Sequence, residues 1–157
     1  MSSSDPAQCV LLADIGGTNV RFALADTGAD NPLLVDSTRE YVVADFPSLA
    51  DAAKHYMDQT GTTARNGVFA AAGRVDGDEV RVTNHPWVIR VPRLKKMLGF
   101  EGVKLMNDFA AQAMASSLLG PDDVAQVGGT PWKPVPLSRN LTYAVIGPGT
   151  GLGLSLI

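Results

Sequence analysis

Short apolar runs separated by glycine-rich or polar turns fill the first part of the chain. Residues 10–13 form one apolar run, and residues 20–25 form a second run that alternates in part. The two runs flank a Gly-Gly pair, which predicts a β-hairpin. A third strand is expected over residues 33–43, after the turn-rich residues 27–32. The chain is therefore expected to open with antiparallel strands.

Helices and strands alternate after this opening. Ser48, with Asp51 three residues later, resembles a capping box, and the apolar spacing that follows predicts a helix ending at Gly61. Residues 67–72 are typical of a buried strand. The pair Asp76-Gly77 between two short apolar stretches predicts a second hairpin.

Further along, a strand over residues 103–106 is predicted between two helices. The first of these is short and is entered through Pro92. The second opens at Asn107-Asp108 and stops at Gly120-Pro121. Its apolar side chains recur at i, i+4 and i+8: Ala110, Met114 and Leu118.

The chain changes character after this helix. Residues 120–140 are rich in proline and glycine without periodicity, which fits a loop or a crossing between domains. Two apolar runs, 141–146 and 152–157, then flank a glycine-rich turn and predict a β-turn-β unit. The whole order indicates an α/β fold with a mixed sheet and flanking helices, not a plain dinucleotide-binding pattern.

Composition adds limits on the function. The 157 residues are 45% hydrophobic and 18% charged, with a net charge of −3, as in an ordinary globular protein. Lysine and arginine are scattered, so neither nucleic acid nor a membrane is expected as a partner. The lone Cys9 excludes an internal disulfide framework and a multi-cysteine zinc cluster. Without a signal-peptide pattern or a stretch approaching the roughly 20 apolar residues that span a bilayer, a cytoplasmic location is expected.

The first candidate site is the segment Asp14-Ile-Gly-Gly-Thr-Asn19. Gly16 and Gly17 allow the backbone to approach an anion and present N–H groups to phosphate oxygens. Thr18 adds a hydroxyl, and Asp14 can hold Mg²⁺ through its waters, as hard oxygen ligands do. A plain hairpin turn is the alternative, and the flanking Asp and Thr favour phosphate binding.

A second glycine-rich segment is Gly147-Pro-Gly-Thr-Gly-Leu-Gly153. Strand-like runs lie on both sides and no helix follows, so the segment does not fit a Rossmann fingerprint. Two interpretations remain open, a second phosphate loop and a flexible turn.

Polar residues at a strand-to-helix junction and in one turn complete the candidates. Ligands in α/β proteins gather at the carboxyl ends of strands, where the carboxylate of Asp108, next to Asn107, can take a proton from a substrate hydroxyl. The alternative is helix capping, which favours the same residue types. Residues 83–87, Thr-Asn-His-Pro-Trp, fit either the lining of a sugar pocket or a turn with a packed tryptophan.

Together these segments resemble the bacterial glucokinase family across almost the whole chain. The matching stretches agree with the family in order and spacing, and they are residues 12–25, 83–87, 106–111 and 146–153. The resemblance implies an actin-like ATPase (ribonuclease-H-like) fold, in which two lobes close over sugar and ATP. It implies a small lobe over residues 1–110, with the first phosphate loop and the Asn-Asp site. Residues 111–157 are then the start of a large lobe, apparently truncated, with the second phosphate loop.

The resemblance also assigns roles. Asp108 is expected to be the general base for the 6-hydroxyl of glucose, and Asn107 and Asp108 to bind sugar hydroxyls, with Asn84 on the sugar side as well. The residues expected at the ATP phosphates are Ala13, Asp14, Ile15, Gly16, Gly17 and Thr18 from the first loop and Gly149, Thr150 and Gly151 from the second. The implied reaction is the ATP- and Mg²⁺-dependent phosphorylation of glucose to glucose-6-phosphate, the first step of glycolysis.

Other functions stay open. A sugar-sensing regulator of the same superfamily carries an N-terminal helix-turn-helix, and with about nine residues before the first strand such a regulator is not expected. A catalytically incompetent fragment of a sugar kinase, or a sugar-binding protein without enzyme activity, is the other alternative. Glucose and ATP are the expected small-molecule partners, and a homodimer is a further expectation.

Overall fold

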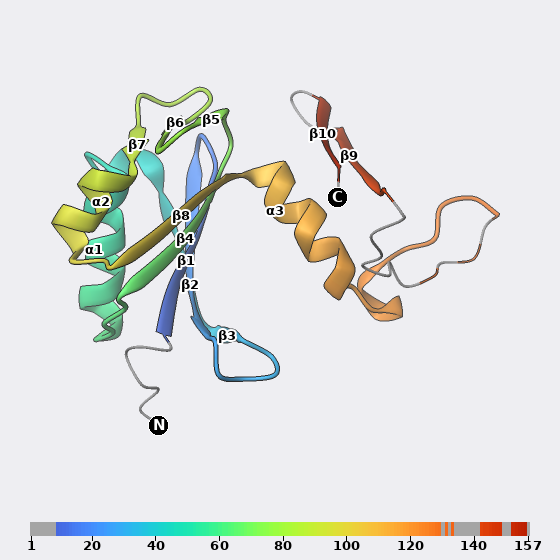
Figure 1. Cartoon of the computed structure of the whole chain (residues 1–157), viewed down its shortest axis with the longest axis horizontal. Coiled ribbons are helices and arrows are strands. Elements are labelled where there is room, and N and C mark those ends of the chain that lie inside the picture. The colour runs from blue at the N-terminus through green and yellow to red at the C-terminus, as the bar shows by residue number, and fades with distance from the viewer. Residues whose placement is uncertain (1–8, 130, 132, 134–141, 149–151, 157) are drawn as a thin grey trace. The chain divides into compact units, whose positions relative to one another are not determined.

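A mixed β-sheet lies at the centre of the first of two units in the structure. The structure is a computed structural model that describes residues 9–129, 131, 133, 142–148 and 152–156. It divides into the units Met1–Asp108 and Phe109–Ile157 (Figure 1).

The sheet of the first unit has five strands in the order β3-β2-β1-β4-β8. Their bounds are β1 Cys9–Ile15, β2 Asn19–Asp26, β3 Leu33–Val42, β4 Asn66–Ala71 and β8 Gly102–Asn107. Strands β1, β2 and β3 pair antiparallel, whereas β1, β4 and β8 pair parallel. The predicted antiparallel opening and mixed sheet are confirmed.

Two helices, α1 (Leu49–Thr60) and α2 (Val91–Leu98), lie on one face of this sheet (Figure 1). Alternate side chains of β1, β2 and β4 are buried with these helices in one core, among them Leu11, Phe22 and Phe69. This alternation is what a sheet with one covered face requires.

The start and the end of α1 are as predicted. The Ser48 Oγ accepts a hydrogen bond from the Asp51 backbone N–H at 3.4 Å, and its hydroxyl donates to the Asp51 carboxylate at 2.6 Å. Gly61 ends the helix in the left-handed conformation, with φ of 64°. Both ends therefore use the local chemistry that the sequence indicates.

A small antiparallel sheet follows β4 in the chain. Its strands are β5 (Val75–Asp76), β6 (Glu79–Arg81) and β7 (Val88–Arg90). The predicted hairpin is confirmed, and it turns at Gly77, whose φ is 56°. Strand β7 is not among the predicted strands, because three residues are too few for a periodicity to be visible.

The helix α3 (Asp108–Ala115) begins at the predicted residue and ends earlier than Gly120. A 3₁₀ turn, Ser116–Leu118, continues it. Ala113 is buried, whereas the predicted apolar positions Met114 and Leu118 are 61% and 84% exposed. Two further 3₁₀ turns span Val43–Asp45 and Pro121–Asp123.

The second unit contains an antiparallel hairpin, β9 (Ala144–Pro148) and β10 (Leu152–Leu156), which confirms the predicted β-turn-β. Gly153 pairs with Gly147 across it. A Cβ on Gly147 would lie 2.6 Å from the Phe109 ring, and one on Gly153 would overlap the same ring. These two glycines are therefore required by packing against Phe109.

Candidate functional site

The carboxyl ends of the parallel strands β1, β4 and β8 lie in register at one edge of the sheet. Ile15 pairs with Ala71, and Ala71 pairs with Asn107. Because neighbouring strands are about 4.8 Å apart, Ile15 and Asn107 are separated by about 10 Å across this edge. The glycine loop that follows β1 and Asp108, which follows β8, leave the sheet at the same end, where α/β proteins bind ligands.

The first loop is closed by its own backbone. The Gly16 N–H donates to the Asn19 carbonyl at 2.9 Å, and the Val43 N–H donates to the Thr18 carbonyl at 2.8 Å. The N–H of Gly16 is therefore used by the turn itself. The loop and its flanks line an open surface pocket: Asp14, Gly16, Gly17, Thr18, Asn19 and Arg21.

Two predicted phosphate-loop residues have buried side chains. Ala13 and Ile15 belong to the hydrophobic core on the helix-covered face of β1. Their side chains therefore anchor the strand that leads into the loop by packing in the core. Asp14, between them, extends to the opposite face and is exposed.

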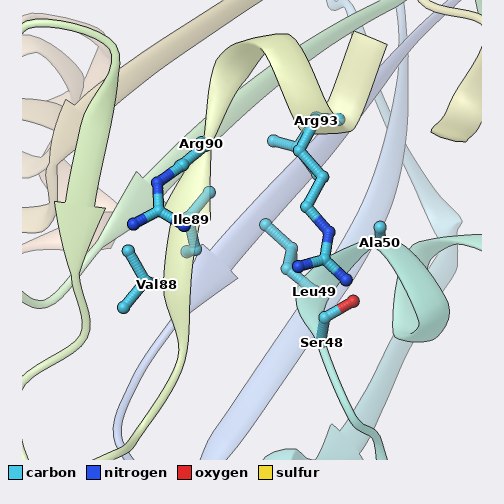
Figure 2. A pocket seen from close by; sticks show the side chains of 8 residues that line it. Ser48, Leu49, Ala50, Val88, Ile89, Arg90 and Arg93 are labelled. Atoms are coloured by element: carbon cyan, nitrogen blue, oxygen red, sulfur yellow. The ribbon is translucent and has the colours of Figure 1, made fainter. Parts of the chain in front are cut away.

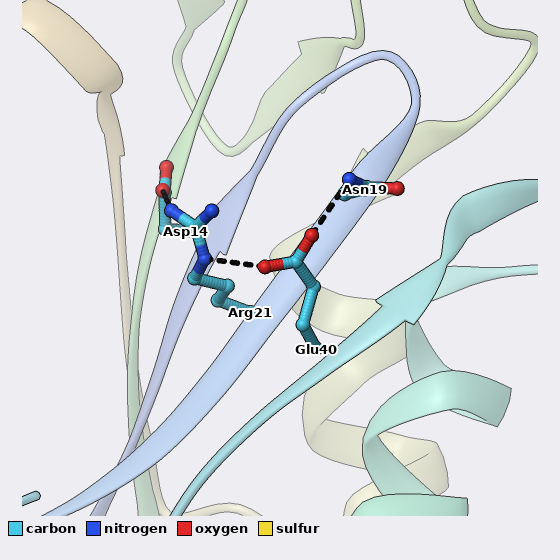
Figure 3. A network of polar contacts seen from close by, with 4 residues as sticks. All are labelled: Asp14, Asn19, Arg21 and Glu40. Carbon is cyan, nitrogen blue, oxygen red and sulfur yellow. Dashed lines mark hydrogen bonds and ion pairs between the residues drawn. The ribbon is translucent and has the colours of Figure 1, made fainter.

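Asp14 belongs to a polar network that crosses three strands (Figure 3). Asp14 pairs with Arg21 across β1 and β2, and Arg21 pairs with Glu40 across β2 and β3. Arg21 Nε lies 2.7 Å from Glu40 Oε2, and Arg21 Nη1 lies 3.9 Å from Asp14 Oδ2. Asn19 Nδ2 donates to Glu40 Oε1 at 2.7 Å. The network joins the edge strand β3 to the pocket.

The surroundings of Asp14 disfavour its charged form. Partial burial by neighbouring atoms raises the pKa of Asp14, Arg21 lowers it, and the carboxylates of Asp108 and Glu40 raise it. The Asp14 side chain is nevertheless 63% exposed, so solvent screens each of these charges. Asp108 is therefore close enough for its charge to contribute to the raised pKa of Asp14.

Asp14 and Thr18 offer the hard oxygen ligands that Mg²⁺ prefers. In the described part of the chain, no three His, Cys, Asp or Glu side chains gather into a metal cage. Such a cage is not needed, because Mg²⁺ usually keeps several waters and takes its other ligands from one or two carboxylates and substrate phosphates. The residues present thus fit the water-mediated magnesium contact expected of Asp14.

Asn107 is fixed to the loop after β4. Its Nδ2 donates to the Gly73 carbonyl at 2.9 Å, and its side chain is half-buried. A Cβ on Gly73 would overlap the Arg81 carbonyl, so this loop lies tightly against β6. Asp108 is half-buried and begins α3. The first turn of a helix also favours an acidic residue, so the geometry fits both the capping role and the chemical role.

The turn around Asn84 lies beside the first loop. The Ala72 N–H donates to the Ile15 carbonyl at 2.9 Å, and the Thr83 N–H donates to the Ala72 carbonyl at 2.8 Å. Asn84 is exposed and has φ of 61°, the one positive φ of a non-glycine residue among those described. Trp87 is 5% exposed, and its Nε1 donates to the Phe46 carbonyl at 3.2 Å. The tryptophan therefore packs in the core, while Asn84 faces solvent.

The structure describes only part of the second glycine-rich segment, residues 147–153. Gly149, Thr150 and Gly151 lie outside the described residues. Their role at the phosphates stays a prediction.

A different pocket lies between the starts of α1 and α2 (Figure 2). It is lined by Ser48, Leu49, Ala50, Val88, Ile89, Arg90, Arg93 and Leu94. None of the predicted site residues is among them. Arg90 Nε is already 2.7 Å from Glu79 Oε2, so this arginine is engaged within the small sheet.

Of the helices that the structure describes, none has the length and apolar composition needed to cross a bilayer.

Sequence reasoning did not single out Arg21, Glu40 or Gly73. The place of Arg21 beside Asp14 could have been predicted from the register of the hairpin, because the two residues lie opposite one another once the loop is placed. The position of Glu40 opposite Arg21 depends on the pairing of β2 with β3, and this pairing includes a register shift between Phe22 and Leu24. No local signal marks that shift in advance.

Comparisons with known proteins agree with the fold. A family model described as Glucokinase matches residues 11–157. The glucokinase of Stenotrophomonas maltophilia (strain K279a) is 65% identical over 148 residues, which cover 94% of this chain and 44% of the relative. The glucokinase of Xanthomonas oryzae pv. oryzae (strain MAFF 311018) is 62% identical over 149 residues, covering 95% of this chain and 44% of the relative.

Among solved structures, the glucokinase from an Antarctic psychrotroph superimposes with a TM-score of 0.77 at 32% identity. The match covers 95% of this chain and 46% of that one. This likeness confirms the actin-like ATPase fold. The chain spans about half the length of the curated relatives it matches. By the family match and these identities, the chain belongs to the glucokinase family.

Proposed function

We propose that this chain supplies the first phosphate loop and the general base of an ATP-dependent glucose kinase. The observation that carries the proposal is the register of Ile15, Ala71 and Asn107, which gathers the glycine loop and the Asn-Asp pair at one edge of the sheet. A kinase needs its phosphate site and its sugar site side by side. The name of the Stenotrophomonas relative, glucokinase, supports glucose as the sugar, and membership of the glucokinase family supports ATP as the donor.

In the proposed reaction, the 6-hydroxyl oxygen of glucose attacks the γ-phosphorus of ATP as the bond to ADP breaks. The hydroxyl proton passes to the Asp108 carboxylate. Asn107 orients the sugar, and its bond to the Gly73 carbonyl holds the amide in one direction. Asn84 binds on the sugar side. Phosphoryl transfer needs little covalent help, so positioning and charge stabilisation account for most of the rate.

On the nucleotide side, the N–H groups of Gly17 and Thr18 are the proposed donors to the phosphate oxygens. Asp14 and the Thr18 hydroxyl would hold Mg²⁺ through water. When bound with ATP, Mg²⁺ neutralises the charge on the phosphates. Gly149, Thr150 and Gly151 are proposed as the second phosphate loop.

The proposed lobes are residues 1–110 for the small lobe and 111–157 for the start of the large lobe. An enzyme of this activity carries out the first step of glycolysis, and the cytoplasm is its proposed location. A homodimer stays a prediction.

A second candidate function is a fragment that lacks activity by itself. The observation that favours it is length, because the match covers 44% of the Stenotrophomonas relative. The remaining part of that relative is the natural source of the groups that would complete the cleft. Since phosphoryl transfer depends on positioning, half of a cleft should lose most of the rate.

A fusion separates these possibilities. The 157 residues are joined to the part of the Stenotrophomonas glucokinase that lies beyond the match, and glucose-6-phosphate formation is followed in a coupled assay. We expect turnover by the fusion and background rates from the chain alone. A folded fusion that phosphorylates no hexose would contradict the kinase proposal. Robust turnover by the isolated, monodisperse chain would contradict the need for a second half.

A further inference from the structure

We propose that Gly17 is a positioning residue for Asn84, so that the phosphate loop and the sugar-side turn act as one packed unit. The inference rests on the proposed function for the roles of the two loops. An ideal Cβ on Gly17 would lie 2.7 Å from the Thr83 carbonyl oxygen and 3.7 Å from Asn84 Cβ. Any side chain at this position therefore pushes on the turn that carries Asn84.

Gly16, the neighbouring glycine, has different surroundings. A Cβ there would meet only the Asn19 carbonyl, at 3.3 Å, within the same loop. Gly16 is thus close only to its own turn, whereas Gly17 is close to the adjoining turn that carries Asn84. A requirement for phosphate binding alone does not explain this difference.

The turn is held in place from its other side. The Thr83 N–H donates to the Ala72 carbonyl at 2.8 Å, and the Ala72 N–H donates to the Ile15 carbonyl at 2.9 Å. Within the turn, the Val82 N–H donates to the Trp87 carbonyl at 3.1 Å. Because these bonds fix the backbone at residue 83, a side chain at Gly17 cannot be accommodated by a simple retreat of the turn.

Asn84 directly follows Thr83, so a strain imposed at Thr83 is passed to the backbone of Asn84. Its φ of 61° lies in the left-handed region, which asparagine tolerates better than most residues. Such a conformation persists where the surroundings over-determine it, and it is frequent at ligand sites. The contact between Gly17 and Thr83 is one of those surroundings. A shift of the loop therefore changes the direction of the Asn84 amide.

Kinetics of the fusion protein test the inference. Gly17→Ala should raise the KM for glucose roughly tenfold in addition to any effect on ATP, since misplacing a positioning group by 1 Å can cost about 10²-fold. Gly16→Ala, the matched control in the same loop, should affect the KM for ATP and leave that for glucose close to the parent value. Gly61→Ala, a strained position with no neighbour within 4 Å, controls for lost stability.

A double-mutant cycle asks whether Gly17 acts through Asn84. Asn84→Gly removes the amide and keeps the positive φ accessible. If the inference is right, adding Gly17→Ala to Asn84→Gly changes the glucose KM little further, because the group being positioned is already gone. Fully additive effects on the glucose KM would overturn the inference. So would an unchanged glucose KM in a folded Gly17→Ala protein.

NMR of the ¹⁵N-labelled chain supplies a readout that is independent of activity. Gly17→Ala should shift the side-chain amide resonances of Asn84, and Gly16→Ala should not. Should Gly17→Ala fail to fold, Asn84→Ala provides the reciprocal test, and it should shift the Gly17 amide. Absence of both shifts would refute the packing link. An inactive fusion with both shifts present would instead refute the kinase proposal alone.

Discussion

Asp14 shows how a single side chain acquires its properties from strand pairing. Its neighbours across the sheet are Arg21 and then Glu40, one of opposite and one of like charge. Partial burial raises the pKa of Asp14, the Arg21 guanidinium lowers it, and Asp108 and Glu40 raise it. To hold magnesium through water, Asp14 must be ionised. The rate of glucose-6-phosphate formation by the fusion protein is therefore expected to fall as the pH drops through the raised pKa of Asp14.

The charges around Asp14 can be tested one at a time. Arg21→Gln removes the cation, so we expect the pKa of Asp14 to rise further. Glu40→Gln removes a repelling carboxylate and releases Arg21 towards Asp14, so we expect that pKa to fall. Carboxyl ¹³C titration of the chain measures both.

Arg65→Gln is the matched control for this titration. Arg65 also forms an exposed ion pair, 2.9 Å from Glu101, and it precedes β4 at the opposite end of that strand from the site. This variant should leave the pKa of Asp14 unchanged. Equal shifts from Arg65→Gln and Arg21→Gln would show that net charge, and not the pairing across the strands, sets the value.

At the scale of the elements, glycines mark places where backbones or rings approach closely. In the second unit, Gly147 and Gly153 face the Phe109 ring from the two strands of the β9–β10 hairpin. Two glycines that the sequence associates with a phosphate loop thus have a packing role in the strands beside it. The loop residues Gly149 to Gly151 keep the phosphate role as a prediction.

Gly153→Ala tests this packing. The new methyl would overlap the Phe109 ring, so we expect the free energy of unfolding to fall by roughly 1–3 kcal/mol, as for other overpacked sites. Amide hydrogen exchange in β9 and β10 should become faster. Gly129→Ala is the control, because a Cβ there meets nothing within 4 Å. Equal protection in the two variants would contradict the packing role of Gly153.

The same scale explains which parts of the fold the sequence predicts. The ends of α1 follow from Ser48 and Gly61, whose capping chemistry is local. The hairpin at Gly77 is equally local. Strand β7 was missed because it is short, and its residues are specified by pairing with β6. The sequence marks the Asn-Asp pair as a candidate because it lies at a strand-to-helix junction. The position of Glu40 beside Arg21 depends on the irregular register between β2 and β3, which no local pattern shows.

At the scale of the whole molecule, the first unit carries the glycine loop, the Asn84 turn and the Asn107-Asp108 pair. All three meet at the edge formed by the ends of β1, β4 and β8. Family membership and fold are shown by the comparisons, while the match covers 44% of the Stenotrophomonas relative. We propose that this edge contains the base of a sugar kinase.

Asp108→Asn in the fusion protein tests that claim most directly. Asparagine keeps the size and polarity of the side chain and removes its ability to take a proton. We predict that kcat for glucose falls by about 10²–10⁴-fold, the usual value of general-base help, while the KM for glucose stays near the parent value. Asp58→Asn, on the exposed surface of α1, should leave kcat unchanged. A near-normal kcat in Asp108→Asn would show that Asp108 is not the base.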